Sequence, residues 1–443
     1  MMTADNKRRR FVSNAIWIMA GNVMHMIIAF IIGIYSARYL GPSNYGLLNF
    51  SASLIAIASA FSSLGFSNTI IKYLVSEKES EGEILGTAVF FRLLASMISL
   101  GAILVIVFIL RPGNRVLMTV ALFQSIGVVF QSFGIFTQWF QSRLRSKVSS
   151  MIATAAYFVT SLFRLYLLLS NKSVEWFAAA SIVEYAVDAI LLAWFYFADG
   201  GMRLCVSWKR GIEMLNTSYH FIISSFMVIA YTQMDKFMLS TMIGDAYTGN
   251  YSVAIGLCDA WTFVLGALID SAAPLIYEAK HNNNSNYERK IKQLNSAVIL
   301  IAGIVAILIS FSARFIILFL YKEEYILAVT PFRILAWYSL FQYLGRIRTI
   351  WATCEGYQKY EKHISVIGLI ANAILNYVLI RLMGINGAAW ATLLTQIVSN
   401  IVILFLFKDL HPYLNILKDS FLFHDVVSRS ELQQLLRKKS VKE

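Results

Sequence analysis

Two sets of charged side chains interrupt long apolar segments of this sequence, and they are the residues whose types could do chemistry. The basic residues are Arg38, Arg92, Arg164, Lys236 and Arg333. The acidic residues are Glu184, Asp188, Asp235, Asp259 and Asp270. An ionisable group within a membrane span is costly, so each is expected to face a helix bundle or water and to mark a functional site.

The basic residues suit an anionic ligand. An arginine guanidinium forms two parallel hydrogen bonds with phosphate oxygens and stays charged when water is removed. We therefore predict that Arg38, Arg92, Arg164, Lys236 and Arg333 contribute to binding an anionic head group. The alternative is that these cations pair with the intramembrane acids and hold helices together, or, for Arg38, that the side chain extends to the membrane interface. The same alternatives stand for Arg346 and Arg348, which lie nearer a span end.

The acidic residues suit a coupling ion. Glu184 and Asp188 are four residues apart and share one face of a helix, which makes them a candidate proton site. Asp259 and Asp270 also share a face, because eleven residues make about three turns. Asp235 cannot pair along a helix with its neighbour Lys236, so the two are expected to point in different directions. These five acids are predicted to bind H⁺ or Na⁺, unless basic residues on neighbouring helices neutralise them.

The composition identifies the class of protein. Of 443 residues, 58% are hydrophobic and only 14% are charged, whereas about 25% charge is usual in soluble domains. The apolar runs are long and continuous, unlike the alternating strands of an outer-membrane barrel. We therefore predict an all-α polytopic membrane protein.

Twelve segments approach or exceed the roughly 20 apolar residues that cross a bilayer. They lie at 11–36, 45–74, 84–110, 116–138, 148–169, 174–198, 214–243, 249–278, 292–320, 327–350, 363–382 and 387–407. Most of the 38 Lys and Arg residues fall in the loops on one side. By the positive-inside rule both termini are cytoplasmic, in a multi-pass membrane protein.

The net charge of +13 is explained by this topology, so no nucleic-acid partner is expected. Interaction with membrane lipids is expected instead. Residues 430–439 combine leucines with basic residues, which suits either a helix on the membrane surface or a solvated tail.

The chain is internally repeated. Gly41 and Gly46 are echoed by Gly244 and Gly249 at one constant offset. The repeat predicts two pseudo-symmetric six-helix lobes, which is typical of transporters that rock one half against the other. The expected divisions are an N-terminal lobe 1–200, a cytoplasmic linker 201–213, a C-terminal lobe 214–407 and a cytoplasmic tail 408–443.

Enzyme chemistry is not expected. The sequence has no phosphate-binding loop ending in Lys-Ser or Lys-Thr, which argues against ATP as the direct energy source. Its six histidines and three cysteines are scattered without metal-ligand or redox spacing. No cofactor is predicted, and no metal site.

Several motifs resemble bacterial polysaccharide flippases, the O-antigen-type exporters. The resembling segments are 34–46, which follows Asn14 and Trp17; 233–239 with 249–254; and 384–392, which follows Asn376. The similarity extends from about residue 11 to 407.

This resemblance implies the multidrug/oligosaccharidyl-lipid/polysaccharide exporter fold, in which two six-helix lobes surround a central cavity. It also implies the substrate, an oligosaccharide repeat unit on undecaprenyl pyrophosphate that is moved to the outer leaflet for O-antigen, lipopolysaccharide, capsule or exopolysaccharide synthesis. Arg38, Asp235 and Lys236 become the best site candidates by their positions in the motifs. A polysaccharide polymerase and a chain-length regulator are possible partners.

Three other functions stay open. A cation-coupled multidrug antiporter would share the fold and depend on the acids. A peptidoglycan-precursor flippase would share the lipid carrier, although extra helices are expected there. A glycosyltransferase or polymerase would need a large soluble loop or domain, and none is evident in the sequence.

Overall fold

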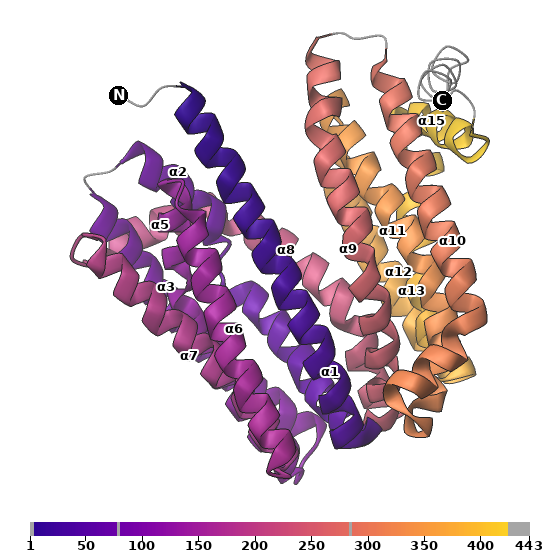
Figure 1. The fold of residues 1–443 in the computed structure, drawn as a ribbon, viewed down its shortest axis with the longest axis horizontal. Coiled ribbons are helices and arrows are strands. Elements are labelled where there is room, and N and C mark those ends of the chain that lie inside the picture. Colours follow the sequence, from indigo (N-terminus) through magenta and orange to yellow (C-terminus); the bar gives the residue numbers. More distant parts are fainter. Residues whose placement is uncertain (1–3, 78–79, 283–285, 424–443) are drawn as a thin grey trace, which may run out of the picture. The chain divides into compact units, whose positions relative to one another are not determined.

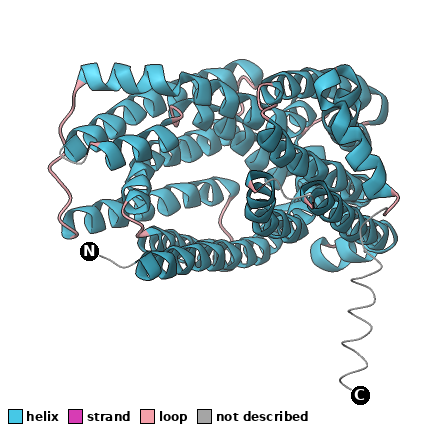
Figure 2. Cartoon of the chain, turned by 90° about the horizontal axis from the view of Figure 1, so that it is seen from above, coloured by secondary structure: helices cyan, strands magenta, loops and turns pink. Residues whose placement is uncertain are grey.

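The computed structural model describes residues 4–77, 80–282 and 286–423, with side chains from Met24 onward except Asn68. Within these ranges the regular elements are all helices, as Figure 2 shows. This confirms the prediction of an all-α membrane protein. The surface helix expected over 430–439 lies outside the described residues.

The chain begins with one long kinked helix. Helix α1 covers Ala4–Ser62, and the kink falls at Gly41, where φ is 68° and Pro42 follows. A positive φ is strained for residues with a Cβ, so glycine permits this bend. The first two expected spans are therefore two arms of one helix, and α2 (Phe66–Ser76) continues after a break at Gly65.

The remaining helices follow in sequence (Figure 1). Between residues 81 and 242 they are α3 (Glu81–Leu110), α4 (Arg115–Gln131), η2 (Ser132–Ile135), α5 (Phe136–Ser142), α6 (Ser146–Leu169), α7 (Val174–Ala198) and α8 (Trp208–Met242). Then come α9 (Asp245–His281), α10 (Tyr287–Tyr321), η3 (Glu323–Ala328), α11 (Val329–Glu355), α12 (Tyr360–Met383), α13 (Ile385–Ile397), η4 (Val398–Val402), α14 (Ile403–Leu406), η5 (Lys408–Leu410) and α15 (His411–Phe421).

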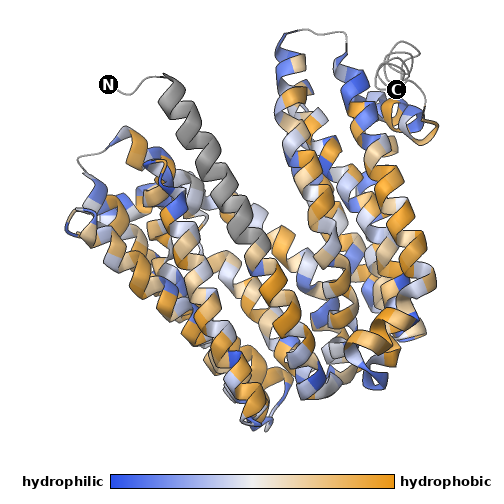
Figure 3. Cartoon of the chain, in the orientation of Figure 1, coloured by the Kyte–Doolittle hydropathy of each residue, from blue (hydrophilic) through white to orange (hydrophobic). Residues whose placement is uncertain are grey.

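Among the described residues, nine helical stretches are long and apolar enough to cross a membrane. One of them, Met24–Ser62, contains both arms of α1. The segments expected as the seventh and tenth spans, α8 and α11, are not among the nine. Figure 3 shows hydrophobic residues along much of each helix and hydrophilic residues gathered toward several helix ends. The protein is thus polytopic, and the number of twelve spans stays a prediction.

The chain divides into two compact units. The first unit comprises Met1–Ser252 with Leu320–Glu324, and the second comprises Val253–Phe319 with Tyr325–Glu443. The boundary between these units falls within α9, whereas the repeat suggests a boundary at 201–213. The proposed division into two lobes of six helices stays a prediction.

The first unit has a buried aromatic centre near the end of α5. Trp139 packs edge-on against Tyr196 of α7, with ring centroids 4.9 Å apart. Its indole N–H donates to the buried carboxylate of Glu81, which also pairs with Arg143 at 2.7 Å. The expected linker packs on the same centre, since the Tyr196 hydroxyl donates to the carbonyl of Met202 at 2.7 Å.

The second unit has a corresponding centre around Trp351 of α11. Its ring lies 5.2 Å from that of Tyr413 in α15. The Tyr413 hydroxyl donates to Asn295 of α10 at 3.1 Å, and Lys292 pairs with Asp419 of α15 at 2.7 Å. Burial raises the pKa of Tyr413 above its ordinary value, which keeps the hydroxyl protonated as a donor. The start of the expected tail is therefore part of the second unit.

Candidate functional site

A polar cluster lies inside the first unit. Arg164 of α6 is 3.9 Å from Glu184 of α7, and both side chains are partly buried. His25 of α1 lies against Tyr157 of α6, with ring centroids 3.8 Å apart. Asp188, one turn beyond Glu184, has no hydrogen-bond or ion-pair partner among the residues that the structure describes. Two carboxylates against one guanidinium leave an excess negative charge, which a proton or cation could neutralise.

Arg92 occupies a different place in the first unit. Its guanidinium donates to the carbonyl of Gln131 at 3.1 Å. Gln131 is the last residue of α4, where the chain tightens into η2. Residues at a helix end leave carbonyls without intrahelical partners, so Arg92 stabilises this break. No acidic partner of Arg92 is found in the described part of the chain.

The three residues favoured by the motif resemblance are spread along α1 and α8. The Arg38 Nε donates to the carbonyl of Leu320, which belongs to the same unit. Asp235 is buried and accepts a 2.7 Å hydrogen bond from the hydroxyl of Tyr251. Lys236 is half-buried. The two neighbours thus differ in surroundings, as their sequence positions suggested.

The two copies of the repeated glycine motif, around Gly46 and Gly249, contact each other. A Cβ at Gly46 would lie 1.7 Å from the carbonyl oxygen of Asp245. A Cβ at Gly249 would lie 2.1 Å from the carbonyl oxygen of Pro42. Only glycine allows backbones to approach so closely. The kink of α1 therefore packs directly on the first turns of α9, within the first unit.

An ion pair that the sequence did not single out lies at this crossing. Arg111 donates to the carbonyl of Ser240 at 2.6 Å and pairs with Asp245 at 3.2 Å. Asp245 stands in the first turn of α9, where a carboxylate is stabilised by the helix dipole. Because Arg111 lies in a loop just beyond α3, its sequence position suggested only a span boundary. The repeated glycines were the one signal that could have located this crossing.

In the second unit, both acids of α9 meet side chains of α11. Asp259 accepts a 2.8 Å hydrogen bond from the hydroxyl of Tyr338. Asp270 pairs with Arg346 at 2.6 Å, and these two side chains are 64% and 47% exposed. The expectation that the acids share one face of α9 agrees with their common neighbour helix.

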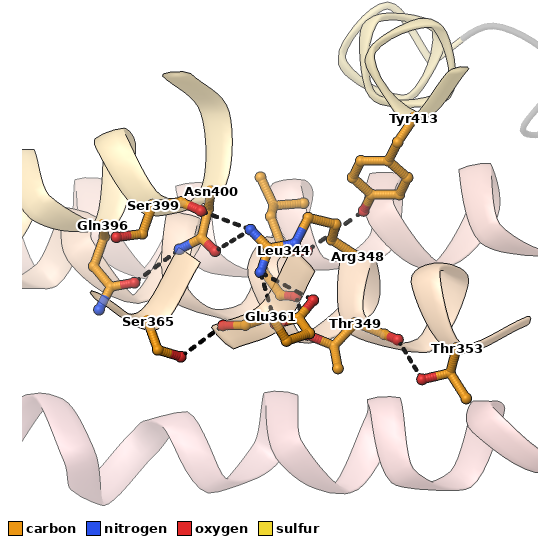
Figure 4. A network of polar contacts seen from close by, with 11 residues as sticks. Leu344, Arg348, Thr349, Thr353, Glu361, Ser365, Gln396, Ser399, Asn400 and Tyr413 are labelled. Carbon is orange, nitrogen blue, oxygen red and sulfur yellow. Dashed lines mark hydrogen bonds and ion pairs between the residues drawn. The ribbon is translucent and has the colours of Figure 1, made fainter. Parts of the chain in front are cut away.

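Arg346 and Arg348 are two residues apart and have opposite surroundings. Arg348 is 3% exposed. It donates to the carbonyl of Ser399 at 2.6 Å, to the Asn400 amide oxygen at 3.1 Å and to Glu361 at 3.2 Å (Figure 4). Ser399 and Asn400 belong to η4, a π-helical turn, which frees carbonyls from the regular ladder. Arg348 is therefore a structural centre of the second unit.

The candidate residues thus form several local groups. Arg164, Glu184 and Asp188 lie together in the first unit, while Arg38 and Arg92 each bond a separate carbonyl. Arg333 is exposed on the first turns of α11. No group of three or more His, Cys, Asp or Glu residues that could hold a metal ion occurs among the described residues.

Comparison with known proteins places these features in context. Residues 11–280 match the family described as "Polysaccharide biosynthesis protein". Comparison of the sequence with curated proteins gives no match.

Solved structures share the fold. A structure titled "Lipid II flippase MurJ, inward closed conformation" has a TM-score of 0.69 and 14% identity, covering 93% of this chain and 92% of that one. An inward-facing multidrug resistance MATE family transporter of the MOP superfamily has a TM-score of 0.60 and 15% identity, covering 89% and 96%. These likenesses show that the chain shares the fold of these proteins.

Proposed function

The chain belongs to the polysaccharide biosynthesis protein family, and from that premise we propose that it translocates undecaprenyl-pyrophosphate-linked oligosaccharide repeat units across the cytoplasmic membrane. The observation that carries the proposal is the family match over residues 11–280 in a chain whose fold resembles a lipid II flippase. The family concerns polysaccharide synthesis, and the fold is that of transporters. A carrier for a lipid-linked glycan satisfies both.

The proposed mechanism is alternating access. The pyrophosphate binds Arg38, Arg164 and Lys236, the glycan occupies polar surface, and the lipid tail stays in the bilayer. Arginine and lysine suit this task because phosphate oxygens accept charge-assisted hydrogen bonds. Movement of one half of the chain relative to the other then exposes the substrate to the opposite side.

Ion coupling is assigned to the polar cluster of the first unit. Glu184 and Asp188 exceed Arg164 by one negative charge, and the cluster lies among candidate spans. Binding of H⁺ or Na⁺ in one state and release in the other would bias transport. Asp235 is a second candidate, because its carboxylate is buried.

A cation-coupled multidrug antiporter is the second candidate function. The observation in its favour is the likeness to MATE transporters at a TM-score of 0.60. It would need the acids but no cations for pyrophosphate. The match to a polysaccharide family therefore favours the flippase.

The cellular setting follows from the proposal. The protein lies in the bacterial inner membrane with both termini in the cytoplasm, and a polysaccharide polymerase and a chain-length regulator act on its product. The lipid bilayer itself contacts the exposed apolar side chains.

Deletion of the gene tests the proposal. We expect loss of surface polysaccharide and accumulation of a complete lipid-linked repeat unit on the cytoplasmic side. A plasmid copy should restore export, and a copy with alanine at Arg38, Arg164 and Lys236 should not. Normal surface polysaccharide together with altered drug accumulation would favour the antiporter instead.

A further inference from the structure

One face of α11 is polar over much of its length. Its polar side chains follow the spacing i, i+4, i+8, i+11, i+15, which keeps them on one side of a helix. They are Tyr338, Gln342, Arg346, Thr349 and Thr353. Together with Asp259 and Asp270 of α9 we call these residues the polar strip.

Two side-chain contacts connect the α9 residues of the polar strip with its α11 residues. Asp259 accepts from Tyr338, and Asp270 pairs with Arg346. The guanidinium of Arg346 lies next to Gly266, between the two acids, since a Cβ there would lie 3.3 Å from an Arg346 nitrogen. Two side chains of the strip on α11, Tyr338 and Arg346, are therefore oriented by carboxylates of α9.

Charge and exposure favour contact of this face with water. Asp270 and Arg346 are well exposed, although α9 is a candidate membrane span, and a charged pair exposed to hydrocarbon would be costly. The exposed face of α10 has the opposite character, with Phe311 85% and Phe315 71% exposed. The second unit thus has both a lipid-like surface and a polar one.

The chemistry of the strip indicates its ligand. Its cation, Arg346, is paired with Asp270 at 2.6 Å, closer than Arg164 is to Glu184 at 3.9 Å, so the strip is the less suited of the two to bind pyrophosphate. Both carboxylates accept hydrogen bonds from side chains of α11. What the strip offers is an ordered array of carboxylate, guanidinium, amide and hydroxyl groups, which matches sugar hydroxyls because these both donate and accept.

We propose that the polar strip is the glycan-contacting surface of this protein, with Asp259, Asp270 and Arg346 hydrogen-bonding the hydroxyl groups of neutral or amino sugars. This inference rests on the proposed function and assigns the two acids to the sugar rather than to the coupling ion.

Binding to the full-length protein in lipid nanodiscs tests the assignment. The probes are the lipid-linked oligosaccharide isolated from cells lacking the gene, and undecaprenyl pyrophosphate without a glycan. The main variant is Asp270→Asn/Arg346→Gln, which removes both charges and so leaves the net charge of the pair unchanged, and the second is Asp259→Asn. The matched control is Lys280→Gln/Glu355→Gln, which neutralises a 2.7 Å pair between the same two helices away from the strip.

We expect each strip variant to weaken binding of the glycosylated carrier by about tenfold or more, because hydrogen bonds to charged groups are lost. Binding of the bare carrier should not change, and the control should bind both like the wild type. Equal weakening for both carriers, or no weakening for either, would overturn the assignment. If the wild-type protein binds neither carrier, the proposed function fails instead.

Discussion

The contrast between Arg348 and Arg346 yields a sharp prediction about stability. Arg348→Ala removes a guanidinium that donates to Ser399, Asn400 and Glu361 in the interior of the second unit. Truncating one partner of a buried pair leaves the other uncompensated, which costs about 3–5 kcal/mol. Arg346→Ala breaks an exposed pair, for which the loss is about 0–1 kcal/mol.

Thermal unfolding of the two variants in detergent micelles, followed by tryptophan fluorescence, measures this difference. Trp351 lies one turn beyond Arg348 and is buried, and it is one of the nine tryptophans that contribute to this signal. We expect a much lower melting temperature for Arg348→Ala and a nearly unchanged one for Arg346→Ala. A double variant, Arg348→Met/Glu361→Leu, should recover part of the loss, because it removes both charges together. Equal losses for the two single variants would refute the distinction between a structural and a functional arginine.

Further predictions concern three other places in the molecule. Gly249→Ala should strongly reduce polysaccharide export, because its Cβ would lie 2.1 Å from the carbonyl oxygen of Pro42; Gly256→Ala, with nothing within 4 Å, should export normally. Asp188→Asn removes the excess negative charge of the first-unit cluster, so export should become insensitive to a collapse of the proton or sodium gradient; export that still follows the gradient would contradict this role. Tyr413→Phe leaves a buried acceptor unsatisfied and should cost about 1–3 kcal/mol in thermal unfolding, and an unchanged melting temperature would contradict the docking of α15 described here.

The helical architecture could be predicted from sequence because its signal is local. Long apolar runs specify membrane helices irrespective of their neighbours. The sequence also predicted an interruption between the first two spans, since Gly41 and Pro42 disfavour a continuous helix. In the structure the backbone of Gly41 is not helical, with φ 68° and ψ 170°, and two helical arms meet there without an intervening loop.

The partners of the charged residues depend on contacts between distant helices. Arg346 and Arg348 have the same side chain two positions apart, and sequence gives no rule for which one is buried. The π-helical turn at Val398–Val402 determines this, since it presents the carbonyl of Ser399 to Arg348. Such a turn has no simple sequence signature, so the network around Arg348 could not be predicted.

The glycine repeat was informative for a different reason. Gly46 and Gly249 were noticed because the motif recurs, and the structure shows that the two copies contact each other. A repeat predicts equivalent positions, whereas contact between them follows only from the packing of α1 on α9.

Flipping by the purified protein tests the central claim most directly. The protein would be reconstituted into liposomes with lipid-linked oligosaccharide from the deletion strain, and the fraction accessible to an added glycan-modifying enzyme would be followed over time. We predict that glycan initially inside becomes accessible only in liposomes that contain the wild-type protein. An accessible fraction that stays equal to that of protein-free liposomes, under an imposed proton or sodium gradient of either direction, would contradict the claim that this chain is a lipid-linked oligosaccharide flippase.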